Sequence, residues 1–129
     1  MGIRSYRDLL VWQRGMGLAE GVYRLTCDFP ADERFGLTSQ ARRAAISVPA
    51  NIAEGHGRAT RGAYANFLRI AHGSLKELET HLILASRVGA TSAVSIEGIL
   101  ADADELGKML QGLLASLARP PNSLERDQD

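Results

Sequence analysis

A group of possible metal ligands is the first feature to consider, because metal sites are built from clustered histidines and acids. His72, Glu77 and His81 are the best candidates, and Glu77 and His81 lie four residues apart, on one face of a helix. A di-iron bundle needs a Glu-x-x-His pair on each of two helices and two further glutamates. The fragment from Glu77 to His81 lacks that spacing and has no second copy. We therefore predict no metal site, and interpret the pair as a polar contact between subunits.

Nucleophilic catalysis finds equally little support. Cys27 is the only cysteine and has no histidine close to it in the sequence, and the serines do not follow a strand in a tight turn. The segment Gly55–Thr60 reads Gly-His-Gly-Arg-Ala-Thr, but a phosphate-binding loop needs wider glycine spacing and a Lys-Ser/Thr pair. We predict no catalytic residue and no cofactor, and interpret this segment as a helix end followed by a turn.

Arginine is the side chain with which this chain could bind a partner. Residues 1–72 contain 10 Arg against 6 acids, a net +4, whereas residues 73–129 contain 5 basic residues against 9 acids, a net −4. The guanidinium group binds phosphate or carboxylate through two parallel hydrogen bonds. Contact with RNA or DNA is one interpretation, and salt bridges with Glu33, Glu54 or Glu79 are the other. The candidate nucleic-acid-binding residues are Arg42, Arg43, Arg58, Arg61 and Arg69.

The segment Phe35–Arg58, which carries three of these arginines, has the pattern of a helix. Its apolar residues recur at alternating spacings of three and four, as in a seam between helices: Leu37, Ala41, Ala44, Val48 and Ile52. We expect Thr38 to cap the start of this helix and Gly55 to end it in the left-handed conformation. Pro49 removes one N–H from the interior and predicts a bend.

Three further amphipathic helices are predicted, at Tyr6–Asp28, Arg61–Val88 and Ser95–Ala118. Four such helices joined by short loops predict an all-α, antiparallel, up-and-down four-helix bundle over residues 1–119. The polar residues 120–129 are expected to form a disordered tail. Because the first and third helices have more apolar width than one seam requires, we also expect self-association.

The turns between these helices carry their own signals. Thr60 is expected to cap the third helix, and Gly89 to end it. Thr91, Ser92 and Ser95 are alternative caps for the fourth helix. Gly15, Gly17 and Gly21 within the first helix each cost about 1 kcal/mol relative to alanine. They either permit close helix contact or are tolerated in a helix that packing holds together.

Several motifs carry a family resemblance by their order and spacing: VWQ at 11–13, FP at 29–30, FGLT at 35–38, RRAAISVPANIAEG at 42–55, GR at 57–58 and FLRIAHGSLKELETHL at 67–82. From about Leu9 to about Leu114 the chain resembles the four-helix-bundle proteins encoded by intervening sequences in large-subunit ribosomal RNA genes. Relatives include the accessory protein of diversity-generating retroelements, which partners a reverse transcriptase and binds nucleic acid. The resemblance implies a ring-shaped homopentamer and no enzymatic activity.

The composition limits the remaining possibilities. No run approaches 18 apolar residues, so we expect no transmembrane helix. The first residues lack the apolar core of a signal peptide, and a single cysteine suits a reducing compartment, so we expect a cytoplasmic location. We therefore expect a non-enzymatic homo-oligomer that contacts RNA or DNA through arginines. The alternative is a purely structural or protein-binding scaffold without nucleic-acid contact.

Overall fold

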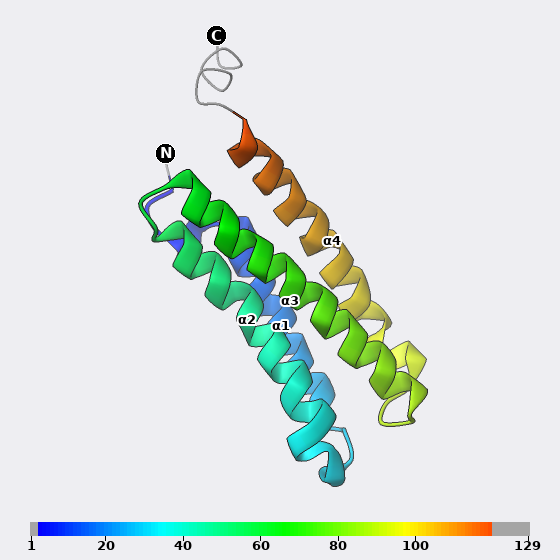
Figure 1. Cartoon of the computed structure of the whole chain (residues 1–129). Helices are drawn as coiled ribbons and strands as arrows, with labels where there is room; N and C mark the ends of the chain where they lie inside the picture. Colours follow the sequence, from blue (N-terminus) through cyan, green and yellow to red (C-terminus); the bar gives the residue numbers. More distant parts are fainter. Residues whose placement is uncertain (1–2, 120–129) are drawn as a thin grey trace.

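All regular structure in the described part of the chain is helical. The structure, a computed structural model, describes residues 3–119. Its four long helices are α1 (Leu10–Thr26), α2 (Ser39–His56), α3 (Arg61–Arg87) and α4 (Ala93–Ala118), with no strand in residues 3–119. Successive helices run in opposite directions, so the α1–α2 and α3–α4 connections lie at the end opposite the α2–α3 connection (Figure 1). The predicted all-α architecture is confirmed. The tail predicted at 120–129 lies outside the described residues.

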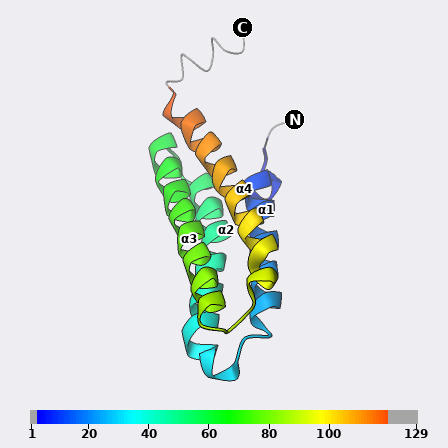
Figure 2. The ribbon, with the colours of Figure 1, turned by 90° about the vertical axis from the view of Figure 1, so that its right-hand side faces the viewer.

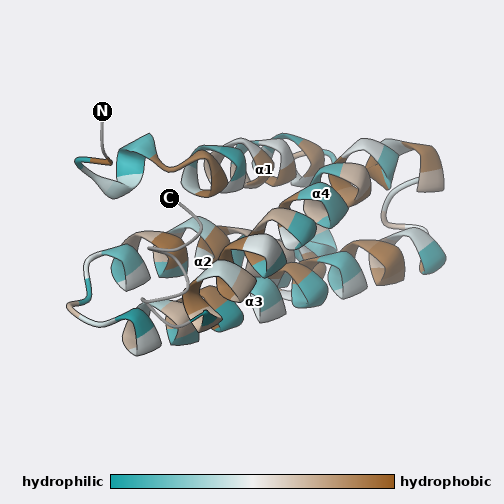
Figure 3. Cartoon of the chain, turned by 90° about the horizontal axis from the view of Figure 1, so that it is seen from above, coloured by the Kyte–Doolittle hydropathy of each residue, from teal (hydrophilic) through white to brown (hydrophobic). Residues whose placement is uncertain are grey.

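The four helices share one apolar core. α2 and α3 pack most extensively, and α1 and α4 pack least among the four neighbouring pairs. Toward its C-terminal end α4 diverges from α1 and approaches the start of α3 (Figure 2). Along each helix hydrophobic and hydrophilic segments alternate (Figure 3), as amphipathic bundle helices require. The seam predicted for α2 is buried except for Leu37, which is half-buried. The largest side chains that are almost fully buried are Val22, Val48, Ile52, Leu68, Leu75, Leu78, Leu82, Leu106 and Leu110.

The start of α1 differs from the prediction of Tyr6. The Ser5 hydroxyl accepts a hydrogen bond from the Arg7 N–H at 3.0 Å, and an Asp8 carboxylate oxygen accepts one from the Ser5 N–H at 3.2 Å. This reciprocal capping closes a separate 3-10 turn, η1 (Tyr6–Asp8). Leu9 then has extended backbone angles, φ −74° and ψ 127°. The continuous helix therefore begins at Leu10, although the apolar period extends further back.

Thr38 does not cap α2, contrary to the prediction. It has helical backbone angles, no capping hydrogen bond from its side chain, and a place in the π-helical turn η3 (Arg34–Thr38) that runs directly into α2. Glu33 acts as the cap instead, because its Oε1 accepts a hydrogen bond from the Leu37 N–H at 3.3 Å. A carboxylate is also the charge that the exposed N–H groups of a helix start favour.

The prediction for Gly55 is also wrong. α2 continues to His56, and Gly89 is the only described residue with a positive φ. A Cβ atom on Gly55 would lie 2.6 Å from Cβ of Phe67, so the missing side chain allows α2 and α3 to approach closely. Tyr64 packs at the same place, and its partial burial raises the pKa of its hydroxyl through desolvation. Packing against α3, rather than chain reversal, explains this glycine.

The other turn predictions hold. The Thr60 hydroxyl accepts from the Ala63 N–H at 3.1 Å, and the Ser92 hydroxyl caps α4 by accepting from the Ser95 N–H at 3.1 Å. Gly89 has φ 81°, and the N–H of Ala90 donates to the carbonyl of Ala85 at 2.9 Å. This is the hydrogen-bond pattern with which a left-handed glycine ends a helix. It sets the tight α3–α4 connection in Figure 2.

Pro49 lies in a helix that continues unbroken through it. Its side chain is buried against α1, where a Cβ on Gly15 would lie 3.4 Å from Cβ of Pro49. Gly15 therefore lies at a close contact between α1 and α2. A Cβ on Gly17 would meet nothing within 4 Å, so that glycine has no such role within the described chain. Of the two alternatives for the α1 glycines, close helix contact applies to Gly15. Tolerance in a helix that packing holds together applies to Gly17.

Candidate nucleic-acid interface

The predicted arginines do not form one cluster. Arg42 and Arg43 lie in the first turns of α2, whereas Arg58 follows the last turn. At 1.5 Å per residue, Arg43 and Arg58 are separated by about 22 Å along the helix axis. Arg61 starts α3, and Arg69 lies two turns further along it. The structure thus separates the five candidates into a pair at one end of α2, a pair at the other end, and Arg69.

Arg61 is held by the end of α4. Its Nη2 donates to the backbone carbonyls of Ser116 at 3.2 Å, Leu117 at 2.7 Å and Arg119 at 2.8 Å. The last carbonyls of a helix have no partner within the helix, and a guanidinium can satisfy them while interacting favourably with the helix dipole. The geometry gives Arg61 an internal role in joining α3 to α4.

Replacing Arg61 by glutamine is therefore expected to loosen the end of α4. Hydrogen bonds to a charged donor contribute about 1.5–3 kcal/mol in buried settings, so we expect a loss of about 1–2 kcal/mol at this partly exposed site. Urea denaturation would measure the loss, and hydrogen exchange would show faster exchange of the last α4 amides. Arg69→Gln is the matched control, because Arg69 is exposed and makes no hydrogen bond or ion pair within residues 3–119. Equal stability of the two variants would contradict the role.

Arg58 is paired within its own segment. Its Nη2 lies 2.9 Å from Oε1 of Glu54, and its guanidinium carbon lies 4.9 Å from the centre of the Phe67 ring. Both side chains of the ion pair are about half exposed. Such a pair contributes little to stability and is screened by salt. One of the predicted salt bridges, with Glu54, is thus present, while Glu33 caps the turn η3 that leads into α2 and Glu79 pairs with Lys76.

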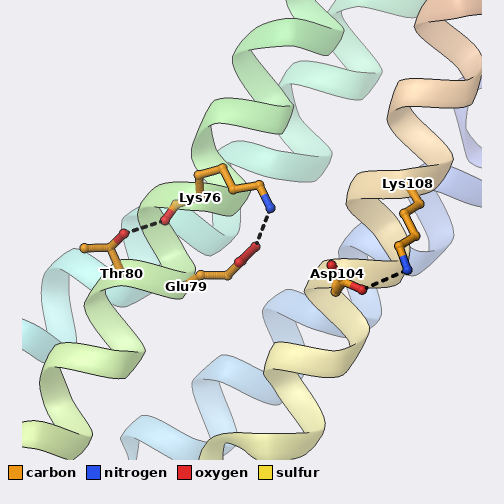
Figure 4. A network of polar contacts seen from close by, with 5 residues as sticks. All are labelled: Lys76, Glu79, Thr80, Asp104 and Lys108. Atoms are coloured by element: carbon orange, nitrogen blue, oxygen red, sulfur yellow. Dashed lines mark hydrogen bonds and ion pairs between the residues drawn. The ribbon is translucent and has the colours of Figure 1, made fainter.

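The two lysines of the chain are paired along their own helices. Lys76 approaches Glu79 on α3 and Lys108 approaches Asp104 on α4, each at 3.2 Å (Figure 4). Thr80 donates to the carbonyl of Lys76 at 2.8 Å in the same view. Because each lysine is already beside a carboxylate, arginines are the better source of a phosphate-binding surface in the described chain.

Arg42 is the most highly constrained of the candidates. Its Nε donates to the Thr26 hydroxyl at 2.8 Å, and that hydroxyl donates in turn to the Val22 carbonyl at 2.8 Å. The guanidinium lies 4.5 Å from the centre of the Tyr23 ring. The sulfur of Cys27, which is exposed, lies 3.8 Å from Nη2. Nη1 makes no hydrogen bond within residues 3–119 and keeps two N–H donors available.

Arg42 and Arg43 line a hollow beside the connection between α1 and α2. We call it the α1–α2 hollow; its volume is about 320 Å³, and its lining contains three arginines, two aromatic rings and no acid. Tyr23 is 42% exposed and Phe35 88% exposed. Arginines beside exposed aromatic rings are the combination that single-stranded nucleic acids bind. The lining residues are Tyr23, Arg34, Phe35, Thr38, Ser39, Arg42, Arg43 and Ile46.

Sequence reasoning missed three residues of this hollow. It placed Tyr23 only within the first predicted helix, Tyr6–Asp28, and did not weigh Arg34 as a candidate, while Phe35 entered only as part of a motif. The adjacent Arg34-Phe35 pair was a usable signal, because an arginine beside an aromatic residue in a connection is exposed together with it. The acids Asp28 and Asp32 lie in the same connection but outside the lining of the hollow.

An apolar groove continues from the hollow along α1 and α2. We call it the α1–α2 groove; its volume is about 500 Å³. On α1, Met16 is 38% exposed and Tyr23 42% exposed, so the surplus apolar width predicted for the first helix does reach the surface. Tyr23 and Ile46 belong to both sites. The groove is lined by Met16, Ala19, Glu20, Tyr23, Arg24, Ile46 and Pro49.

The metal candidates remain apart from these sites. His81 Nε2 lies 3.4 Å from Oε1 of Glu77, while His72 lies beside Gly107 of α4. No group of three or more His, Cys, Asp or Glu residues within residues 3–119 is arranged to hold a metal ion. Among the described helices, none combines the length and apolar character that crossing a membrane requires.

Two comparisons with known proteins found matches. The family model described as 23S rRNA-intervening sequence protein matches residues 7–112. The fold is similar to a crystal structure of a protein of unknown function from the S23 ribosomal protein family of Bacteroides thetaiotaomicron, with a TM-score of 0.73 and 25% sequence identity. That similarity covers 81% of this chain and 98% of the other. No curated protein matches the chain.

Proposed function

The chain belongs to the 23S rRNA-intervening sequence protein family, and we propose that it acts without catalysis, as a homo-oligomeric adaptor that binds RNA or DNA. The observation that supports nucleic-acid binding best is the α1–α2 hollow. Three arginines line it beside two exposed aromatic rings, and no acid lines it. Of these arginines, Arg43 is exposed without a partner in the described chain, and Arg69 outside the hollow is a further exposed guanidinium of this kind. The expectation from the sequence motifs that relatives include the retroelement accessory protein agrees with this proposal.

The proposed assembly is a ring-shaped homopentamer. The α1–α2 groove supports self-association, because a helix face with exposed Met16, Tyr23 and Ile46 gains stability when a second copy covers it. In a ring each arginine is repeated around the axis, so a modest charge per chain produces a strong local field. The proposed location is the cytoplasm, and the lone Cys27 with no partner for a disulfide suits it.

A titration of the whole protein against labelled RNA and DNA strands tests nucleic-acid binding. We expect binding at about 50 mM salt that weakens at about 200 mM, because each neutralised phosphate releases a counterion. For about four phosphate contacts on a single strand the loss is about 50-fold. Lys108→Gln is the control, since Lys108 already pairs with Asp104 and its loss should change little. Absence of binding at low salt, or an affinity that does not change with salt concentration, would overturn the proposal.

A scaffold without nucleic-acid contact is the second candidate function. The α1–α2 groove favours it, because its lining is mostly apolar and would suit a protein partner, such as a reverse transcriptase, as well as a second copy. A pull-down from lysate with and without nuclease separates the two functions. Partners that survive nuclease support the scaffold, and partners lost with the nucleic acid support the adaptor.

A further inference from the structure

We propose that the α1–α2 hollow holds an unpaired nucleotide of a single strand. Its base stacks on Phe35, and its phosphate is bound by Arg42 and Arg43. This inference rests on the proposed nucleic-acid binding and specifies where the strand lies and which form is preferred. It follows from three features of the hollow, namely a constrained guanidinium, a presented aromatic face and a lining without acids.

Arg42 is prepared to bind a phosphate before the ligand arrives. The chain of hydrogen bonds from Nε through Thr26 to the Val22 carbonyl holds the guanidinium in place, and the Tyr23 ring supports one of its faces. Binding therefore orders this side chain little further, which reduces the entropy lost. The free Nη1 donors lie on a side chain that lines the hollow. Arg43 is adjacent in the chain, exposed and without a partner in the described residues.

Phe35 presents a ring that residues 3–119 leave largely uncovered, with the Arg34 guanidinium over it. At 88% it is the most exposed large hydrophobic residue described, and leaving such a ring in water forgoes the free energy that burial provides. Its turn is held on both sides. Glu33 accepts from the Leu37 N–H at 3.3 Å, and a Cβ on Gly36 would lie 2.7 Å from Glu33 Oε1. Arg34 lies beside the ring, with its guanidinium carbon 5.9 Å from the ring centre.

These features favour an unpaired base over a duplex. Stacking on an aromatic side chain needs the face of a base, which neighbouring base pairs cover in a double helix. The volume of about 320 Å³ lies in the range of small-ligand pockets, which suits a nucleotide and excludes a whole duplex. Since every base has such a face, the hollow should tolerate different sequences.

The test compares the affinities of the full-length protein for three labelled ligands by fluorescence anisotropy: a uridine strand, a thymidine strand of the same length, about twelve nucleotides, and a duplex. We expect both strands to bind more tightly than the duplex at equal salt. Phe35→Leu keeps apolar bulk but removes the aromatic face, and should weaken strand binding about 5- to 50-fold. Arg43→Gln should weaken it about tenfold and lower the salt slope. Val94→Leu, in the exposed first turn of α4, is the matched control for Phe35.

The outcomes separate this inference from the function on which it rests. If the unmodified protein binds neither strands nor duplex, the proposed function fails. If it binds but Phe35→Leu and Arg43→Gln bind as tightly as the unmodified protein, nucleic acid binds elsewhere and the inference fails. In that case, weaker binding by the Arg69→Gln variant would place the binding surface around Arg69. Light scattering on each variant completes the test, because a change in mass with Phe35→Leu would assign Phe35 to a subunit contact instead.

Discussion

Replacing Ile46 by glutamate is expected to separate the proposed assembly into single chains of 13.9 kDa. Ile46 is 45% exposed on α2 and lies between Tyr23 and Pro49 along the α1–α2 groove. A carboxylate at this position would lose its hydration when a second copy covered the groove, and the desolvation penalty is several kcal/mol. Each 1.4 kcal/mol changes a dissociation constant tenfold, so we expect at least a 100-fold weakening.

Light scattering coupled to size-exclusion chromatography would measure this change. The unmodified protein should have a mass of about 70 kDa if five chains of 13.9 kDa associate. Ile83→Glu is the control, because Ile83 is a helical isoleucine of similar exposure, 41%, on α3 outside the groove. Circular dichroism should show that both variants remain helical. A monomeric unmodified protein, or an Ile46→Glu variant that keeps its mass, would refute assembly through the groove.

Replacing Gly55 by leucine is expected to lower the free energy of unfolding by about 3 kcal/mol or more, at the upper end of overpacking effects. Even the Cβ of the new side chain would lie 2.6 Å from Cβ of Phe67 and 3.2 Å from Cδ1 of Tyr64. A Cβ atom cannot change rotamer, so α2 and α3 must move apart. Their contact is the most extensive in the bundle. For a chain of this length, we expect the melting temperature to fall by roughly 10 °C.

A series of glycine substitutions isolates the clash from the helix propensity. Gly55→Ala should fall between the native protein and Gly55→Leu, because alanine regains about 1 kcal/mol of helix propensity while keeping the Cβ clash. Gly73→Ala on α3 is the control: a Cβ there meets nothing within 4 Å, so it should raise the stability by about 1 kcal/mol. Thermal and urea unfolding measure all three. A stable Gly55→Leu variant would show that the close approach of α2 and α3 does not need glycine.

The two incorrect predictions in α2 have a common cause. Thr38 and Gly55 were assigned from residue types that frequently begin and end helices. In the structure the Glu33 side chain takes over the capping role of Thr38, and contact with Phe67 explains Gly55. Thr60, Ser92 and Gly89 were assigned by the same reasoning, and there the local hydrogen bonds agree with it. Residue type suffices where a turn makes only local contacts.

The candidate nucleic-acid interface shows the same difference between what residue type predicts and what packing decides. The charge of residues 1–72 and the arginine content indicated a binding chemistry, but the five arginines named from their positions do not share one environment. Arg61 donates hydrogen bonds to backbone carbonyls at the end of α4, and Arg58 forms an ion pair with Glu54. Arg42 is held in place beside the α1–α2 hollow. A guanidinium on a long flexible side chain can reach several partners. The partner that it meets therefore depends on which helix packs beside it.

Four amphipathic helices, their approximate ends and the apolar seam of α2 were determined by the sequence alone, because helix periodicity and local hydrogen bonding act between residues a few positions apart. Tertiary structure decided which arginines remain available, why Gly55 is a glycine, and that Tyr23 and Phe35 flank one hollow. These properties depend on contacts between residues far apart in the chain. Such contacts exist only after the helices have packed.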